Sequence, residues 1–449
     1  MCYNALLIFN KDFAMLKSIL PLSFIIATRF FGLFIVLPVL SLYALELQGA
    51  NEFLTGLLIG IYALMQMLFQ VPFGVLSDKI GRKKALCLGL VVFIIGSAVC
   101  AVANDIWLMM IGRALQGSGA VGAVATAMIS DFVKEEQRSK AMAIMGACIG
   151  LAFALSMVLS PLLSQHFGLA SLFWISIALT ALCIVLLYTA VPKEPKITAK
   201  SPKTPILQLL KQKNLALMNL TSFMQKMLIA IAFFIIPLVL VRFDYPKNEL
   251  WLVYAWAMIA GFLAMGVAGA LGERRGLSKL LLLVGVGIFA LAFALMSLAF
   301  ELGAYSVGIF IAGVVVFFVG FNLHEPIMQS VASKFALANE RGAALGVFNA
   351  FGYGGSFLGG LVSGLAWEFL SMLELTVVLL IIICAWFVLL CFLKSPSDFK
   401  NLYLALDTKL DTNALSSHKG IVEIYTNSTQ LVIKYDSKII DEKALKGLL

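Results

Sequence analysis

The chain has 449 residues, of which 61% are hydrophobic and 13% are charged, and its mean hydropathy is +0.99. This composition excludes a soluble globular protein and indicates a polytopic membrane protein. The formal net charge of +9 does not require a nucleic-acid partner, because the cations fall on one set of loops. The seven cysteines include no Cys-x-x-Cys pair and nearly all lie in apolar runs, so we expect no metal site, no cofactor and no disulfide framework.

Twelve apolar stretches divide the chain into candidate membrane helices. Each is close to the ~20 residues that a helix needs to cross a bilayer. The first 18 residues lack the ordered regions of a cleaved signal peptide, so we expect the first helix to remain as an anchor. The predicted spans are 19–43, 53–73, 85–103, 106–129, 141–163, 169–191, 215–241, 250–271, 280–300, 305–331, 343–367 and 372–393.

Basic residues are distributed unevenly between the loops. The loops assigned to the cytoplasm, together with the N-terminal tail, carry 20 Lys or Arg residues, whereas the opposite loops carry only Arg242 and Lys247. The positive-inside rule then predicts that both termini are cytoplasmic. We therefore expect a multi-pass protein of the bacterial inner membrane.

The segment 192–214 differs in composition from the spans around it, with four prolines and six lysines. This composition predicts that the segment is a solvated cytoplasmic linker that ends in a short surface helix. The domains expected are a cytoplasmic tail at 1–18, a six-helix bundle at 19–191, the linker, and a second six-helix bundle at 215–394. Residues 269–276 weakly repeat the pattern at 74–84, which is typical of parallel six-helix repeats.

After residue 394 the chain is no longer membrane-like. Short strands are predicted at 402–406, 421–425 and 430–435, followed by a helix at 441–449. Residues 395–449 are therefore expected to form a small cytoplasmic α+β lobe. A disordered tail is the alternative, and the alternation of apolar and polar residues at 422–425 argues against it.

Ionisable side chains inside a membrane span are costly, so each one is a candidate functional residue. Four such residues are Arg29, Arg113, Lys226 and Glu325. Glu325 is the clear intramembrane carboxylate, and since burial favours its neutral form, it is suited to load and release a proton. His324 is a second candidate for proton coupling. The alternative interpretation is a structural ion pair of Glu325 with Lys226 or Arg29.

Uncharged polar side chains also recur within the spans. Tyr62, Gln66 and Gln70 are spaced four residues apart and form one stripe along the second span, as expected for a cavity-lining face. Hydrogen bonding between helices is the alternative role. Gln225 and Asn322 add polar groups to the seventh and tenth spans, and we include all five among the predicted substrate-cavity residues, together with Arg29, Arg113 and Lys226.

A charged stretch from Gly74 to Lys84 separates the second and third spans and is predicted to be a loop. It follows the pattern Gly-x-x-x-Asp-(Lys/Arg)-x-Gly-(Arg/Lys)-(Arg/Lys), and a plain basic turn is the alternative interpretation. The pattern resembles the signature loop of the major facilitator superfamily. Arg113 to Gly119 is similar to the Arg-x-x-Gln-Gly-x-Gly motif in the fourth span of that family.

Further motifs narrow the resemblance. Residues 32–40 resemble the first-span motif of the twelve-span drug:proton antiporters, whereas Ser160-Pro161-Leu162-Leu163 departs from their Gly-Pro-x-x-Gly-Gly run. The sequence Phe321 to Glu325 and the strand-rich tail resemble YajR-type transporters, which carry a small ferredoxin-like domain after the last span. This tail is shorter than theirs, so a complete domain is not implied.

The resemblance implies a conformational gate. The carboxylate of Asp78 is expected to face the start of the eleventh span, whose N–H groups carry partial positive charge, and Gly74 is expected to allow a close approach of the two helices. Arg82 is expected to pair with Asp131. The predicted gate residues are Gly74, Asp78, Gly81, Arg82, Asp131, Arg138 and Arg341.

Together these features predict a monomeric, proton-driven carrier of twelve helices in a lipid bilayer that exports small amphipathic or cationic compounds. Uptake of a metabolite with protons is one alternative. A membrane sensor that signals through its tail is an alternative of another class, although it would not need the charges in the cavity. No nucleophile–base pairing or cofactor motif indicates an enzyme.

Overall fold

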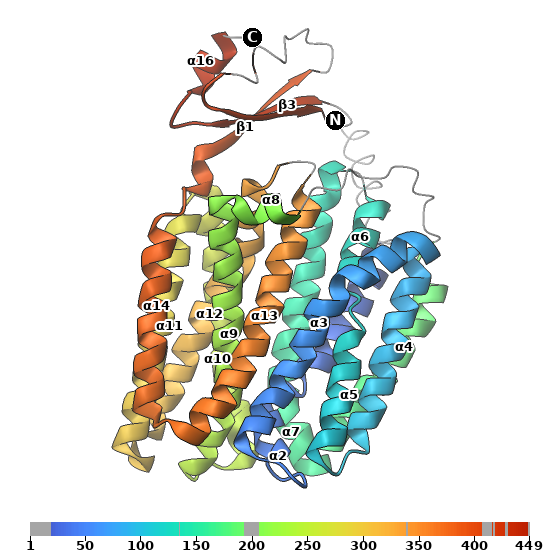
Figure 1. The fold of residues 1–449 in the computed structure, drawn as a ribbon, viewed down its shortest axis with the longest axis vertical. Coiled ribbons are helices and arrows are strands. Elements are labelled where there is room, and N and C mark those ends of the chain that lie inside the picture. Colours follow the sequence, from blue (N-terminus) through green and yellow to red (C-terminus); the bar gives the residue numbers. More distant parts are fainter. Residues whose placement is uncertain are drawn as a thin grey trace, which may run out of the picture.

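The computed structural model describes residues 19–133, 135–192, 206–337, 340–405, 415, 418–426 and 430–447. A body of long helices carries a small sheet at one end (Figure 1). The helices of the first half are α2 (Leu37–Ala44), α3 (Glu52–Ile80), α4 (Arg82–Ala101), α5 (Ile106–Ser118), α6 (Gly122–Phe132) and α7 (Glu135–Thr189). Those of the second half are α8 (Ile206–Lys211), α9 (Lys213–Arg242), α10 (Leu250–Arg274), α11 (Ser278–Leu302), α12 (Val307–Phe335), α13 (Arg341–Phe369) and α14 (Met372–Cys391).

Ten helices among the described residues are long and apolar enough to cross a membrane, the first being Ile19–Ala44. Two features explain the difference from the twelve predicted spans. The fifth and sixth predicted spans are joined in α7, where the chain turns at Gly168 with a φ of 72°. The fourth predicted span is divided into α5 and α6 by residues 119–121.

The prediction of a loop at residues 74–84 is wrong, because all but one of these residues are helical. The helix α3 continues through residues 74–80, Gly81 adopts a φ of 97°, and α4 starts at the next residue. A single glycine at positive φ reverses the chain, as at many helix ends, so no longer loop is needed. The charged motif therefore consists of two helix ends and one glycine.

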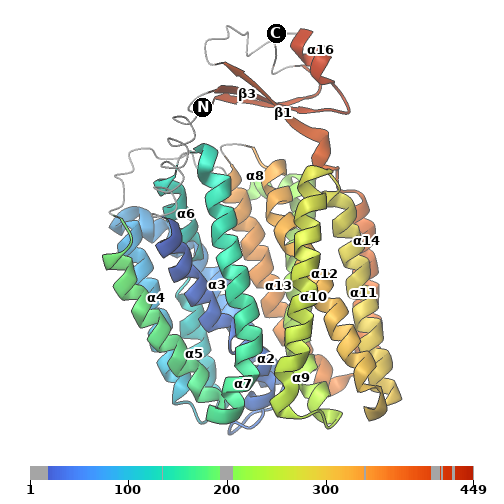
Figure 2. The ribbon, with the colours of Figure 1, turned by 180° about the vertical axis from the view of Figure 1, so that it is seen from behind.

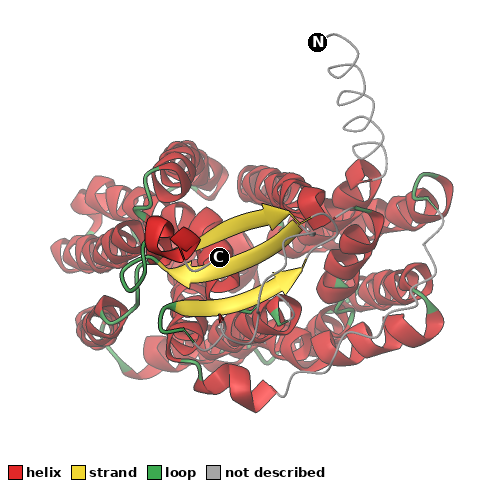
Figure 3. Ribbon diagram, turned by 90° about the horizontal axis from the view of Figure 1, so that it is seen from above, coloured by secondary structure: helices red, strands yellow, loops and turns green. Residues whose placement is uncertain are grey.

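The lobe after α14 is a three-stranded antiparallel sheet with a short helix. Its strands are β1 (Phe399–Ala405), β2 (Ile421–Thr426) and β3 (Gln430–Asp436), in the order β1-β3-β2, followed by α16 (Glu442–Gly447). Leu402, Ile433, Tyr435 and Leu445 form its own small core. Viewed along the long axis, the strands lie over the ends of the helices (Figure 3). We call this side of the body the lobe end and the opposite side the distal end.

The two halves meet closely at the distal end. A side chain at Gly56 would place its Cβ 2.4 Å from the carbonyl oxygen of Gly360, and one at Gly364 would lie 2.6 Å from the carbonyl oxygen of Glu52. These distances mean that α3 and α13 pack backbone against backbone there. Across the same end, Ser41 Oγ donates to the carbonyl oxygen of Phe234 at 3.0 Å.

The halves separate toward the lobe end. The ribbons of α3 and α13 diverge in this direction (Figure 1), and those of α7 and α10 do so on the opposite side of the body (Figure 2). Glycines on all four of these helices have no atom within 4 Å of a Cβ built on them, namely Gly74, Gly146, Gly266 and Gly342. The two halves are therefore not in close contact at these four glycines.

Candidate functional site

The sole carboxylate among the four predicted intramembrane charges forms an ion pair across the second half. Glu325 on α12 accepts hydrogen bonds from Lys226 Nζ on α9, with 3.2 Å to each carboxylate oxygen. Gln225 Nε2 donates to the same carboxylate at 3.2 Å, and the ammonium group of Lys226 also lies 4.8 Å from the ring centre of Phe321. The predicted alternative of a pair between Glu325 and Lys226 is therefore present.

This ion pair is partly exposed although one of the two helices that carry it, α9, is largely buried. The side chains of Lys226 and Glu325 are 30% and 43% exposed, whereas 89% of the most apolar stretch of α9 is buried inside the protein. Ion pairs with this much exposure typically contribute only about 0–1 kcal/mol to stability. The pair therefore contributes little to holding α9 and α12 together.

The described hydrogen bonds of His324 and Asn322 are made outside the ion pair. The ring of His324 is fully buried, its Nε2 lies 2.8 Å from the carbonyl oxygen of Leu282 on α11, and it packs edge-on against Trp386 of α14. Asn322 donates to the carbonyl oxygen of Phe318 in its own helix at 2.9 Å. The geometry gives both residues contacts within the second half, and of the two candidates for proton coupling only Glu325 is exposed.

Arg29 and Arg113 form a second buried cluster in the first half. The guanidinium of Arg113 lies 4.8 Å from the ring centre of Tyr62 and donates to Gln116 Oε1 at 2.8 Å. Arg29 lies 5.7 Å from the same ring and donates to the carbonyl oxygen of Gly119 at 3.0 Å. The described contacts of these two cations are with aromatic rings and neutral oxygens, so their charges are held by cation–π and dipole interactions.

The polar stripe on α3 mainly joins helices. Gln66 Nε2 donates to the carbonyl oxygen of Gly117 on α5 at 2.9 Å and to the hydroxyl of Tyr62 at 3.2 Å. Tyr62, Gln66 and Gln70 are all at most 6% exposed. For Gln66 the structure therefore shows the interhelical hydrogen bonds that were the alternative to a cavity-lining role.

The charged motif at the lobe end forms a network around Arg82. Arg82 Nη1 lies 2.6 Å from Asp78 Oδ1, and its Nε lies 3.1 Å from Asp131 Oδ2. The expected pairing with Asp131 is thus present. The carboxylate of Asp78 is 63% exposed, and Gly74 has open space around it, so the expected close contact with α13 is not made in this conformation.

The other two gate candidates lie at helix starts. Arg341 is the first residue of α13, and its guanidinium lies 6.0 Å from the ring centre of Tyr425 in β2. Arg138 lies in the first turn of α7, and its side chain is outside the described part of the structure.

Sequence reasoning missed the hydrogen bonds that hold Arg113. Gln116 links Arg113 to Ser97 Oγ of α4, to which its Nε2 donates at 2.7 Å. The spacing of three residues between Arg113 and Gln116 places both on one helix face, and that signal was available from the motif. The contact with Ser97 depends on how α4 packs against α5, which the sequence does not reveal.

The sequence of the chain matches a known family of membrane proteins. A family model for the Major Facilitator Superfamily matches residues 22–360. The chain belongs to this superfamily. It is 32% identical over 429 residues to the inner membrane transport protein YajR of Escherichia coli (strain K12), covering 93% of this chain and 94% of that protein. The resemblance inferred from the motifs is therefore confirmed, and the protein is a multi-pass membrane transporter.

Other relatives in the superfamily are more distant. A class E tetracycline resistance protein of Escherichia coli is 28% identical over 293 residues, covering 58% of this chain and 68% of that protein. The crystal structure of the human organic anion transporter MFSD10 (TETRAN) aligns with a TM-score of 0.64 and 17% identity, covering 84% of this chain and 99% of that chain. At that identity the structural match supports the fold alone.

Proposed function

We propose that this protein is a proton-coupled secondary active transporter that exports small amphipathic or cationic compounds by alternating access. The observation that carries the proposal is the partly exposed ion pair of Lys226 and Glu325, which joins two membrane-spanning helices of the second half. The name of the class E tetracycline resistance protein supports export, because resistance to a drug is commonly achieved by removing it from the cell.

The proposed topology has twelve spans, six in each half, with both termini in the cytoplasm. Two arguments support it: α7 contains two apolar stretches separated by the turn at Gly168, and α5 and α6 together cover one predicted span. The lobe end is then cytoplasmic, in agreement with the excess of Lys and Arg on that side. The described conformation, accessible from the lobe end, is in this proposal the inward-open state.

The coupling follows from the cost of charge in a closed cavity. While the lobe end is open, water and Lys226 stabilise the ionised carboxylate of Glu325, so a proton is released to the cytoplasm. The neutral form is less costly while the cavity is closed, so a proton that the carboxylate takes up from the outside crosses with it as the transporter returns to the state open at the lobe end. The proton gradient thereby biases the equilibrium between the two states, because protonation stabilises them differently.

Substitution of Glu325 tests the coupling. In proteoliposomes with an imposed pH gradient, Glu325→Gln is expected to abolish proton-driven substrate accumulation while substrate binding and exchange persist, since glutamine mimics the neutral acid. Intravesicular pH during addition of a panel of dyes and metabolites is the measurement. Glu301→Gln, an exposed carboxylate at the end of α11, is the matched control and should behave as wild type. Proton movement with substrate in Glu325→Gln would place the coupling at another group.

A further inference from the structure

The sheet of the lobe packs directly on the ends of two helices of the second half. Lys434 of β3 is 3% exposed, and its Nζ donates at 2.9 Å to the carbonyl oxygen of Ala336, the residue that caps α12. Phe399 of β1 packs edge-on against Phe335 with 5.6 Å between ring centres. Through Tyr425, which contacts Arg341, the sheet also reaches the first residue of α13.

Between the sheet and these helix ends lies a cleft of about 340 Å³, which we call the lobe cleft. Its size is within the range of small-molecule sites. The register of β1 on β3 places three β1 side chains on the same sheet face as Lys434, and the cleft continues around the free edge of β1. Its lining residues are Lys334, Arg341, Phe399, Lys400, Asn401, Tyr403, Lys434, Tyr435 and Glu442.

The charges of the lobe cleft are strongly unbalanced. Four cations, Lys334, Arg341, Lys400 and Lys434, line it, with Glu442 as the carboxylate. That carboxylate is already paired with Lys446 Nζ at 2.7 Å. The lining residues of the lobe cleft therefore carry more positive than negative charge.

Lys434 and Arg341 show that the excess of positive charge in the lobe cleft is unfavourable. Burial and the charge of Arg341 lower the pKa of Lys434 to about 8, against a smaller opposing effect of Glu423. The Nε of Arg341 is buried and has no hydrogen-bond partner among the described residues. An anion placed between these groups would neutralise the repulsion and supply an acceptor to the guanidinium.

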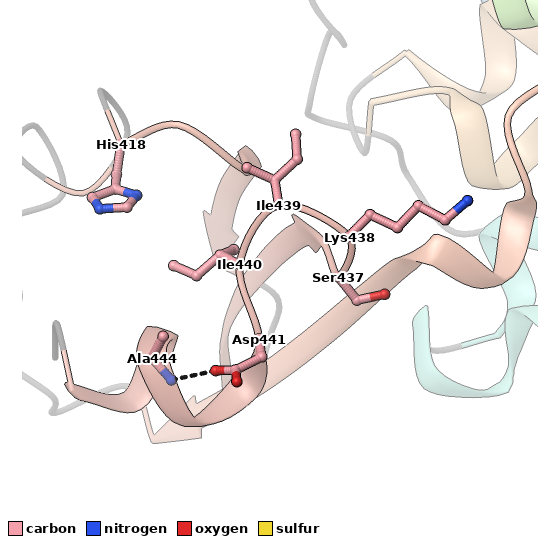
Figure 4. A pocket seen from close by; sticks show the side chains of 7 residues that line it. All are labelled: His418, Ser437, Lys438, Ile439, Ile440, Asp441 and Ala444. Carbon is pink, nitrogen blue, oxygen red and sulfur yellow. Dashed lines mark hydrogen bonds between the residues drawn. The ribbon is translucent and has the colours of Figure 1, made fainter.

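A second hollow on the lobe provides a contrast (Figure 4). It measures about 530 Å³, and the charged side chains around it are engaged elsewhere. Asp441 accepts a hydrogen bond from the backbone N–H of Ala444 at 2.6 Å, and Lys438 extends away from the other lining residues to Asp398 at 2.9 Å. This hollow therefore has no unbalanced charge that would attract an ion.

We propose that the lobe cleft binds a phosphate-bearing anion, held by Lys334, Lys434 and Arg341 with Lys400 at its rim. The guanidinium of Arg341 and the ammonium groups suit phosphate oxygens, and Asn401 is a neutral donor beside them. Because Lys334 and Arg341 belong to α12 and α13, the bound anion joins the lobe to both helices. A soluble phosphate compound and the headgroup of an anionic lipid share this chemistry.

The test uses the full chain in nanodiscs and separates the two sources. One arm titrates inorganic pyrophosphate into protein in phosphatidylcholine discs, with sodium chloride of equal ionic strength as reference. The other arm measures retention of phosphatidylglycerol by native mass spectrometry. Binding in either arm supports the proposal and identifies the source. It should weaken between pH 7 and pH 9, because Lys434 loses its proton as the pH passes about 8.

Variants of the cleft decide whether binding is specific. The double variant Lys334→Gln/Lys400→Gln changes two side chains that are not fully buried and should lower affinity at least tenfold. Lys443→Gln, an exposed lysine of α16 outside the cleft, should leave affinity unchanged. No binding in either arm, or equal affinity of the double variant and wild type, would overturn the proposal. Both outcomes are independent of whether the protein transports protons.

Discussion

The distal end and the lobe end of the helical body differ in how the two halves meet. At the distal end, Gly60 and Gly360 bring α3 and α13 into backbone contact, and Lys247 pairs with Glu46 across the halves at 3.3 Å. At the lobe end, a Cβ built on Gly74 would have no neighbour within 4 Å, and the side chain of Asp78 is 63% exposed. The helices α3 and α13 have glycines at both ends. In this conformation, the glycines at the distal end allow the two helices to pack closely, whereas Gly74 and Gly342 at the lobe end have open space around them.

We propose that this difference reflects two states of the transporter, each closed at one end. A glycine in the middle of a helix costs about 0.5–1 kcal/mol relative to alanine, so a glycine without close neighbours is unfavourable in the state described here. Such a glycine is explained if another state brings a helix against it. The asymmetry is therefore what alternating access requires, since closure at one end accompanies opening at the other.

The largest expected effect comes from filling the distal contact. A Cβ at Gly360 would lie 2.7 Å from backbone atoms of Gly56 and Gly60, so Gly360→Leu forces α3 and α13 apart. Transport should be lost, and cysteines introduced near the distal end should become reactive to impermeant thiol reagents. Gly287→Leu, at a glycine of α11 with open surroundings, is the control and should transport normally. Normal transport by Gly360→Leu would refute the distal closure.

The mirror substitution at the lobe end should trap the opposite arrangement. Gly74→Leu meets open space in the described conformation, so the protein should fold and insert. If α13 approaches Gly74 in the other state, the leucine blocks that closure, and transport falls while the distal end stays protected from thiol reagents. Transport at the wild-type rate, measured in the same vesicles, would show that Gly74 never meets a helix.

A smaller effect is expected from Asp78→Asn. The change removes a charge that is proposed to meet the N-terminus of α13 when the lobe end closes. Transport should fall by about tenfold, or ~1.4 kcal/mol, within the range for a charge at a helix terminus. Membrane insertion should stay nearly normal, because the carboxylate is exposed here. Asp105→Asn changes a helix cap at the distal end and controls for loss of charge. An unchanged rate for Asp78→Asn would remove Asp78 from the gate.

Much of this architecture could be predicted from sequence, because a membrane helix must satisfy its own backbone hydrogen bonds and therefore appears as a long apolar run. The ion pair of Glu325 with Lys226 was among the predicted alternatives for the same reason, since a charge in lipid needs a partner. The continuation of α3 to Ile80 was missed because polar residues at a helix end resemble those of a loop. Which end is open could not be predicted, because the glycines at both ends suit both states.

The smallest expected effect comes from deleting the lobe, which touches only the open end. Truncation after Pro396 removes the ring contact of Phe399 with Phe335 and the hydrogen bond from Lys434 to Ala336. Such contacts contribute about 0.5–1.5 kcal/mol each, whereas the helices keep their own hydrogen bonds and the distal contacts are untouched. The truncated protein should therefore insert, remain monodisperse in detergent and unfold only a few degrees lower than the full chain, as measured by thermal unfolding. Aggregation of the truncated protein, with full-length protein as the control, would mean that the lobe is required to hold the open ends of α12 and α13 in place.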